Sequence, residues 1–181
     1  DISVVPWTSC SAESDLKSSS RSRPYFLSVF FTKVFMVNLS NLSENLQELM
    51  NEHGLNQSTL AEAMNTDSSK ISSYITAKRA PNYTTFIALI EYFHCSADFL
   101  LGLREYPCEE IRYQPVRPFG ERLREILQET DTTQYRFIKQ TKISWSVFYN
   151  WLTGKSFPSM DNLVKIAGYF GCSVDLLLGR V

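Results

Sequence analysis

The sequence has only two histidines, four cysteines and seven glycines among its 181 residues, and these small numbers exclude several classes of protein. The cysteines form no Cys-x-x-Cys pair and show no zinc spacing, which argues against a structural metal site or a disulfide framework. Histidine, serine, cysteine and carboxylate residues do not gather in a catalytic pattern, and no glycine-rich loop could cradle a phosphate. We therefore expect no enzyme, no metal and no cofactor.

A hydrophobic run long enough to cross a membrane is also missing. The apolar segment 25–37 has thirteen residues interrupted by Lys33, whereas a membrane-spanning helix needs about 20. No small-x-small cleavage site follows it, so it does not resemble a signal peptide. Met36 stands directly before the first regular pattern. We expect residues 1–37 to be an N-terminal extension, disordered or not native, with Met36 as the natural start, and we expect no membrane partner.

What the sequence does contain is a repeat. Residues 42–102 recur as residues 119–179 at a constant offset of 77 positions, without a gap, and 17 of the 61 aligned positions are identical. Many of the other positions exchange one apolar residue for another. We therefore expect a domain at 38–103 (copy one), a linker at 104–118 and a second domain at 119–181 (copy two). The linker contains three prolines, which favour an extended chain.

Each copy shows helical periodicity throughout, and no segment alternates with period two long enough to form a strand. We predict an all-α fold with five short helices per copy, near 42–53, 57–64, 68–76, 83–93 and 97–101, and again 77 residues later. Asn41 and Glu44 suggest a capping box for the first helix, and Gly54 should close it. The later helices follow residues whose side chains can cap a first turn, namely Asn56/Thr133, Asp67/Ser144, Asn82/Ser159 and Ser96/Ser173.

Several recurring residues have ordinary structural explanations. The aromatic pairs Tyr74/Trp151 and Tyr92-Phe93/Tyr169-Phe170 should lie in the cores, and Cys95/Cys172 should be small buried residues in a reducing cytoplasm. Asp98 and Asp175 fit first-turn acids favoured by the helix dipole. His53 and His94 have no histidine counterpart in copy two, which indicates surface positions.

The second and third helices of each copy are too short to be stable alone and must pack against each other. The ordered elements Gln57-x-x-Leu60-Ala61, Ser69-x-Ile71, Lys78-Arg79-x-Pro81 and Leu100-Leu101-Gly102 resemble the Cro/lambda-repressor-like (XRE-type) helix-turn-helix family. Copy two repeats them as Gln134-x-x-Phe137, Ser146-x-Phe148, Lys155-x-x-Pro158 and Leu177-Leu178-Gly179. The usual glycine of the turn is replaced by Asn65 and Lys142, of which Asn adopts a left-handed conformation more easily.

The resemblance implies double-stranded DNA as the partner, with the third helix of each copy, the recognition helix, in the major groove. The residues that it places at the DNA are Gln57, Ser68, Ser69, Lys70, Ser73, Thr76, Lys78 and Arg79 in copy one, and Gln134, Trp145, Ser146, Val147, Asn150 and Lys155 in copy two. It further implies a cytoplasmic transcriptional regulator, a bacterial or prophage repressor. Because the two recognition helices differ, we expect an operator without strict two-fold symmetry.

The alternative function is a protein-interaction or dimerisation module in which one or both copies no longer bind DNA. Net charge does not decide between the two, because the whole chain carries −1. Locally, residues 38–103 have seven acids and three bases, whereas residues 119–181 have six acids and eight bases. Copy two is therefore the better candidate for a polyanion. The sequence leaves open whether two chains form a homodimer.

Overall fold

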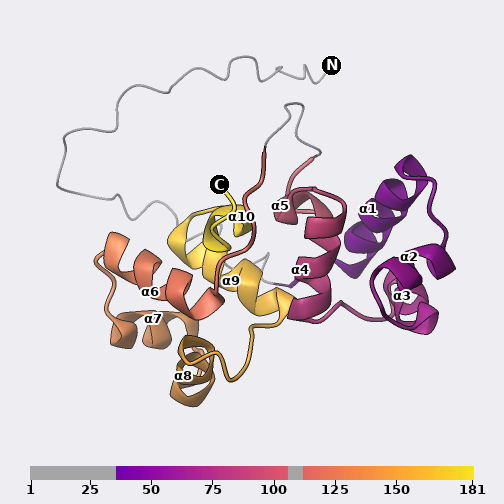
Figure 1. Ribbon diagram of the computed structural model, residues 1–181. Helices are drawn as coiled ribbons and strands as arrows, with labels where there is room; N and C mark the ends of the chain where they lie inside the picture. The colour runs from indigo at the N-terminus through magenta and orange to yellow at the C-terminus, as the bar shows by residue number, and fades with distance from the viewer. Residues whose placement is uncertain (1–35, 106–111) are drawn as a thin grey trace, which may run out of the picture. The chain divides into compact units, whose positions relative to one another are not determined.

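The computed structural model describes residues 36–105 and 112–181, and within these ranges it contains ten α-helices and no strand (Figure 1). This confirms the all-α fold. The expectations for residues 1–35 lie outside the described residues. None of the helices in the described ranges is long and apolar enough to cross a membrane.

Each copy consists of five helices. In copy one they are α1 (Leu39–Glu52), α2 (Gln57–Ala63), α3 (Ser68–Ile75), α4 (Tyr83–Tyr92) and α5 (Ala97–Leu100). In copy two they are α6 (Phe119–Glu129), α7 (Gln134–Thr141), α8 (Trp145–Leu152), α9 (Met160–Phe170) and α10 (Val174–Leu177). The predicted helices are confirmed, and their ends differ from the prediction by at most three residues.

The predicted N-caps are confirmed for the later helices and wrong for the first. The N-cap of α1 is Asn38, three residues before the proposed cap Asn41, and it accepts a hydrogen bond from Ser40 N at 3.0 Å. The residues predicted to cap the remaining copy-one and copy-two helices all occupy N-cap positions. Asp67 alone among them accepts no hydrogen bond from the first turn.

Left-handed backbone conformations recur in register in the two copies. Five equivalent pairs of residues have positive φ: Gly54/Asp131, Asn65/Lys142, Ala77/Gly154, His94/Gly171 and Gly102/Gly179. Each pair ends a helix or a turn, where the left-handed residue reverses the chain. The repeat is therefore preserved in the backbone even where the residue type is not. In three of the five pairs a strained non-glycine residue in one copy is matched by glycine in the other.

The two cores use equivalent residues. Ile71 and Phe148, from the recognition helices, are completely buried, and Tyr74 and Trp151 are almost so. Tyr92 is an error of the sequence prediction: it is 40% exposed and only its neighbour Phe93 is buried. Helix α4 ends at Tyr92, so this side chain falls on the solvent side of the last turn. His53 and His94 are exposed, as predicted.

The short helices α5 and α10 contact each other across the two copies. Asp98 Oδ1 and Oδ2 accept hydrogen bonds from Val174 N at 3.1 Å and Asp175 N at 3.2 Å, the first amides of α10. Asp175 in turn accepts Ala97 N at 2.9 Å and the Ser96 hydroxyl at 2.6 Å, at the start of α5. Both acids are buried. The prediction that they favour their own helix dipoles therefore missed their main contacts, which are with the other copy.

Arg180 completes this contact. Its side chain is buried, and Nη1 donates to Asp175 Oδ1 at 2.6 Å and to the Cys95 carbonyl at 2.9 Å. The guanidinium also lies over the ring of Tyr113, 4.5 Å from its centroid. Burial raises the pKa of the Cys95 thiol to about 12, so the thiol is protonated and unreactive at neutral pH.

Part of the linker is held against copy two. Residues 112–118 are not helical, as the prolines predict, and Gln114 N and Arg117 N donate to the Arg180 and Leu178 carbonyls. The Arg117 guanidinium pairs with Glu125 through two bonds of 2.6 and 2.7 Å. These hydrogen bonds lower the pKa of Glu125. The end of the linker is thus bound to copy two over these residues.

Candidate nucleic-acid interface

In copy one the helix-turn-helix is built by α2 and α3, which lie side by side (Figure 1). Leu60 and Ala61 of α2 and Ile71 of α3 are buried between them and α1. Asn65 makes the turn with a φ of 46°, in the left-handed region, as predicted for the residue that replaces glycine. The packing of these apolar side chains directs the opposite face of α3 to solvent.

In copy two the same arrangement is built from aromatic residues. Phe137 of α7 and Phe148 of α8 are fully buried with ring centroids 5.5 Å apart. Lys142 adopts the left-handed conformation, with a φ of 55°. Lys142 is exposed and lies in the turn before the recognition helix, so its positive charge is available to a ligand there.

The first helix of each copy fixes the carboxyl end of the recognition helix. In copy one, the Ser43 hydroxyl donates to the carbonyl of Ile75, the last residue of α3. In copy two, Arg124 Nη2 donates to the equivalent carbonyl, that of Leu152, at 2.5 Å. Gly120 takes the place of Ser43; a Cβ atom here would lie 2.6 Å from the Trp151 carbonyl, so this close approach of α6 to α8 requires glycine. Both recognition helices are therefore held rigidly by their own domain.

All the residues that the sequence predicted at the DNA are at least partly accessible. Ser73 and Asn150 are half-buried, and the other members of the predicted set are exposed: Gln57, Ser68, Ser69, Lys70, Thr76, Lys78 and Arg79 in copy one, and Gln134, Trp145, Ser146, Val147 and Lys155 in copy two. Exposure makes them available for a ligand; their contact with DNA stays a prediction.

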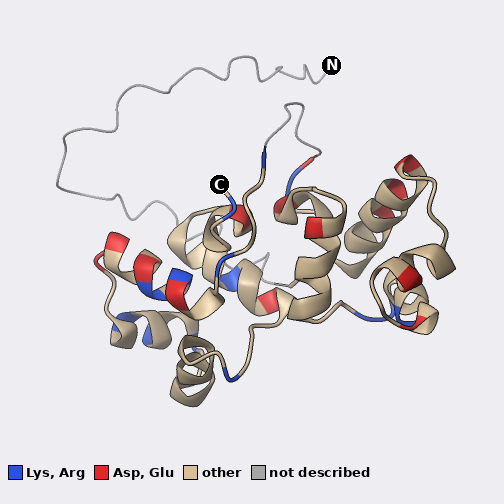
Figure 2. Ribbon diagram, viewed as in Figure 1, with Lys and Arg blue, Asp and Glu red and all other residues tan. Residues whose placement is uncertain are grey.

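In copy one, acidic residues lie at the amino end of the recognition helix and along α1. The carboxylate of Asp67 lies at the amino end of α3 and pairs with Lys70, Nζ to Oδ2 3.1 Å. Lys70 is thus partly neutralised before any phosphate approaches. Glu44, Glu48 and Glu52 form an exposed row along α1, one helical turn apart, and Figure 2 shows the acidic residues of this helix in red. This row opposes the approach of a polyanion to that side of copy one.

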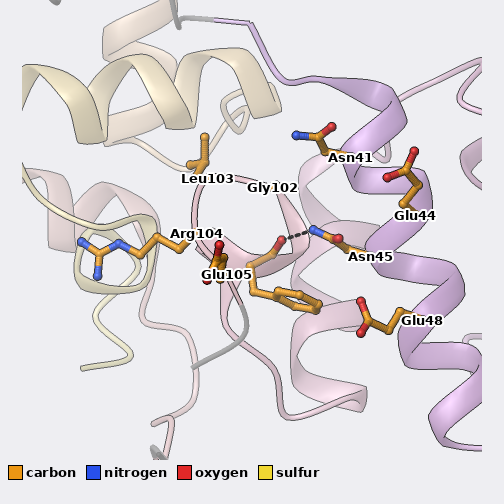
Figure 3. Close-up of a pocket in the computed structure, with 9 residues that line it drawn as sticks. Asn41, Glu44, Asn45, Glu48, Gly102, Leu103, Arg104 and Glu105 are labelled. Carbon is orange, nitrogen blue, oxygen red and sulfur yellow. Dashed lines mark hydrogen bonds between the residues drawn. The ribbon is translucent and has the colours of Figure 1, made fainter. Parts of the chain in front are cut away.

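A hollow beside α1 carries the same charge (Figure 3). It has a volume of about 530 Å³ and is bordered by Glu44, Glu48 and Glu105 against the single guanidinium of Arg104. Asn45 Nδ2 crosses its floor to donate to the Phe99 carbonyl at 2.6 Å. Three carboxylates and one base do not suit a nucleic acid, so this hollow is not part of the candidate interface.

Copy two differs in charge within the helix-turn-helix itself, although its first helix α6 repeats the glutamates of α1 as Glu121, Glu125 and Glu129. No acidic residue occurs between Asp131 and Asp161 in the sequence, and this stretch contains four bases: Arg136, Lys139, Lys142 and Lys155. All four are exposed. Figure 2 shows blue residues on α7, whereas α8 itself carries no charge. The arrangement is an uncharged helix bordered by cations.

The exposed face of α8 is aromatic, and part of it was missed by the sequence reasoning. Trp145 is 56% exposed and Tyr149, one turn further along, is 50% exposed. Tyr149 was not predicted as a site residue, because in the sequence it looks like its neighbours Phe148 and Trp151, which are buried. Its equivalent in copy one is the polar, half-buried Ser72, and this polarity was the one sequence signal for a surface position. The side-chain amide of Asn150 makes no hydrogen bond with any described residue.

The first turns of α2 and α7 differ in how many of their amides are already used. In copy one, Asn56 Oδ1 accepts from both Ser58 N and Thr59 N at 2.9 Å. In copy two, Thr133 Oγ1 accepts from Arg136 N at 3.2 Å. The first turn beside Gln57 therefore offers fewer free amides to a phosphate than the first turn beside Gln134.

This geometry defines the class of protein: two all-α domains, each exposing one short helix fixed by a helix-turn-helix. Comparison with known families agrees. A helix-turn-helix family model matches residues 46–100, and the model of the Cro/C1-type helix-turn-helix DNA-binding domain matches residues 122–181. The chain therefore belongs to the XRE-type helix-turn-helix proteins and carries two such domains in tandem. No curated protein and no solved structure matches it.

Proposed function

We propose that this protein is a sequence-specific DNA-binding transcriptional regulator, a repressor without enzymatic activity, which acts in the cytoplasm of a bacterium. The observation that carries the proposal is the recognition helix α8, which is exposed, uncharged and bordered by Arg136, Lys139, Lys142 and Lys155 with no acid nearby in the sequence. Cations beside a groove-sized helix neutralise phosphates on either side of the groove that the helix enters.

The two copies contribute unequally in this proposal. Copy two supplies most of the phosphate contacts, because its four bases are unpaired with acids from their own stretch of chain. Copy one presents α3 with Ser68, Ser69 and Ser73 as short polar groups suited to base edges, but Asp67 lowers its attraction for phosphate. Because the two copies are joined in one chain, binding of copy two to DNA raises the effective concentration of copy one at the neighbouring site. The operator should therefore lack strict two-fold symmetry.

A second function is favoured for copy one by its charge. The Asp67–Lys70 pair and the excess of seven acids over three bases in residues 38–103 fit a surface that contacts a protein and not DNA. In this alternative, copy two alone binds DNA and copy one serves as a protein-interaction or dimerisation module. Homodimerisation of the chain stays a prediction in both cases.

Selection of bound duplexes from a random library with the purified full chain tests the proposal. A regulator that uses both copies should enrich a site with two different sequence blocks. Enrichment of one block would favour the alternative for copy one. Recovery of no preferred sequence would contradict sequence-specific binding.

A further inference from the structure

The recognition helix of copy two has an aromatic strip with no ligand assigned to it. Trp145 and Tyr149 are 56% and 50% exposed and lie one turn apart on α8. Helical geometry places Ser146 and Asn150, also one turn apart, on the neighbouring strip of the same outward face. The buried side is formed by Phe148 and Trp151. The outward face thus carries an apolar strip beside a polar one.

Trp145 and Tyr149 are not needed to build the core. Trp145 is anchored at its base by Phe148, with ring centroids 6.0 Å apart, and the rest of its ring faces solvent. The equivalent positions of copy one are Ser68 and Ser72, and copy one folds with the same helices. The fold therefore does not require aromatic residues at these two positions, and their exposure has a cost in water that a ligand would remove.

The charge around the strip indicates what covers it. The cations of α7, the turn and the segment after α8 are all exposed, and an apolar partner surface would leave them unpaired. A DNA duplex pairs them with phosphates and at the same time offers apolar groups in the major groove, the C5 methyl groups of thymine. An adenine on the same base pair presents the donor and acceptor that an asparagine amide matches.

We propose that α8 reads A·T base pairs, with Trp145 and Tyr149 packed against thymine methyl groups and Asn150 hydrogen-bonded to adenine. This inference rests on the proposed DNA binding and names what the second recognition helix selects. Copy one, with serines at the equivalent positions, has no such preference. Specificity for thymine methyl groups is therefore a property of copy two alone.

Replacement of thymine by deoxyuridine tests the proposal, because it removes only the methyl group and keeps the phosphates and the base pairing. The probe is a duplex selected by the full chain, with each thymine replaced singly. We expect the dissociation constant to rise about three- to fourfold for each contacted methyl, the effect of one buried methyl group, and we expect those positions to cluster in one block of the site.

The variants Trp145→Ser and Tyr149→Ser carry the copy-one residues at the equivalent positions. Each variant should bind the thymine duplex more weakly than the wild type does. Replacement of a thymine that the lost side chain contacts by deoxyuridine should then leave the variant's dissociation constant unchanged. Tyr149→Ser is the stronger test, since the Tyr149 ring stacks on no aromatic ring of the described core, whereas Trp145 contacts the buried Phe148, so Trp145→Ser must first be shown to keep its thermal midpoint. Tyr135→Ser is the matched control: it removes an aromatic ring that is 73% exposed on α7, and should keep the full sensitivity to uridine.

The outcomes separate this inference from the proposed function. A selected duplex that binds tightly, but is insensitive to uridine at every position, overturns the methyl readout and leaves DNA binding intact. The same holds if Tyr149→Ser keeps the wild-type sensitivity, or if it changes the association state of the chain and leaves DNA affinity unchanged. Failure to select any duplex overturns both.

Discussion

Asp98 and Asp175 are equivalent residues of the two copies, and each accepts first-turn amides of the other copy's short helix. Asp98 accepts the first two amides of α10, and Asp175 accepts Ala97 N and the Ser96 hydroxyl at the start of α5. Four-residue helices are not stable alone. The ends of the two copies are the most similar part of the repeat, and this contact gives a reason for it. The same aspartate position in each copy binds the short helix of the other copy.

Removal of the two acids should have unequal effects. Asp98→Ala loses two amide bonds and should lower the free energy of unfolding by about 1–2 kcal/mol, the cost of a lost cap. Asp175→Ala also leaves the buried Arg180 guanidinium without its carboxylate, and should cost about 3–5 kcal/mol. Urea unfolding of the full chain measures both.

The exposed Glu52, whose side chain forms no hydrogen bond or ion pair with a described residue, supplies the control. Glu52→Ala should change stability by less than about 0.5 kcal/mol. Equal losses for Asp98→Ala and Asp175→Ala would mean that Arg180 does not depend on Asp175, against the 2.6 Å contact between them.

The stability should also depend on the ionisation of Asp98. Burial raises the pKa of Asp98 above its ordinary value of 3.8, against the opposing effect of the two amide bonds. The folded chain therefore holds this proton more tightly than the unfolded chain. Its stabilising contribution is complete below pH 3.8 and is lost as the pH rises through the raised pKa.

Comparison with Asp98→Asn isolates this contribution, because other titrating groups such as Glu125 are common to both proteins. The difference in unfolding free energy, wild type minus variant, should fall as the pH rises from below 3.8 and become flat above the raised pKa. A difference that grows with pH would show that the pKa is lowered and that the amide bonds outweigh burial.

The left-handed pair Ala77 and Gly154 offers a reciprocal test of backbone strain. Ala77 has a φ of 53°, which costs an L-residue about 1 kcal/mol, whereas its equivalent is glycine. Ala77→Gly should therefore stabilise copy one by up to about that amount. Gly154→Ala should destabilise copy two by about 1 kcal/mol. A Cβ at Gly154 meets no atom within 4 Å, so the backbone conformation is the only cost.

Thermal unfolding of both variants and of the double variant checks this pair. The two changes should have opposite signs. Destabilisation by Ala77→Gly would show that the half-buried methyl group of Ala77 contributes more through packing than the strain costs.

The helices could be predicted because their signals are local. Caps such as Asn56 and Ser159, and apolar residues at helical spacing, act within one or two turns and recur in both copies. Asn41 was misplaced because Asn38 offers the same side chain one turn earlier. Tyr92 was misplaced because it stands directly before the buried Phe93. Only the position of the end of α4 shows that Tyr92 faces solvent and Phe93 does not.

The contacts between the copies could not be predicted from periodicity. Asp98 and Asp175 look like ordinary first-turn acids, and nothing local shows that their partners lie about 77 residues away. The outward face of α8 was also only partly predictable. Trp145 was identified from its place at the start of the helix, whereas Tyr149 required the burial of Phe148 and Trp151 to be known.

The salt dependence of DNA binding tests the central claim, that α8 and its border of bases bind a duplex. Binding of the selected duplex by the full chain is measured at several salt concentrations, for wild type and two variants. One variant carries Arg136→Gln, Lys139→Gln, Lys142→Asn and Lys155→Gln; Asn is the residue that copy one has at the turn. The other carries Lys70→Gln, Lys78→Gln and Arg79→Gln.

We predict a steep fall of affinity with salt for the wild type, and a slope of log K against log salt that is shallower by about four in the copy-two variant, one for each lost phosphate contact. The copy-one variant should lose about two, because Lys70 is already paired with Asp67. Wild-type binding that is flat with salt, or an unchanged slope in the copy-two variant with its fold intact, would contradict the account.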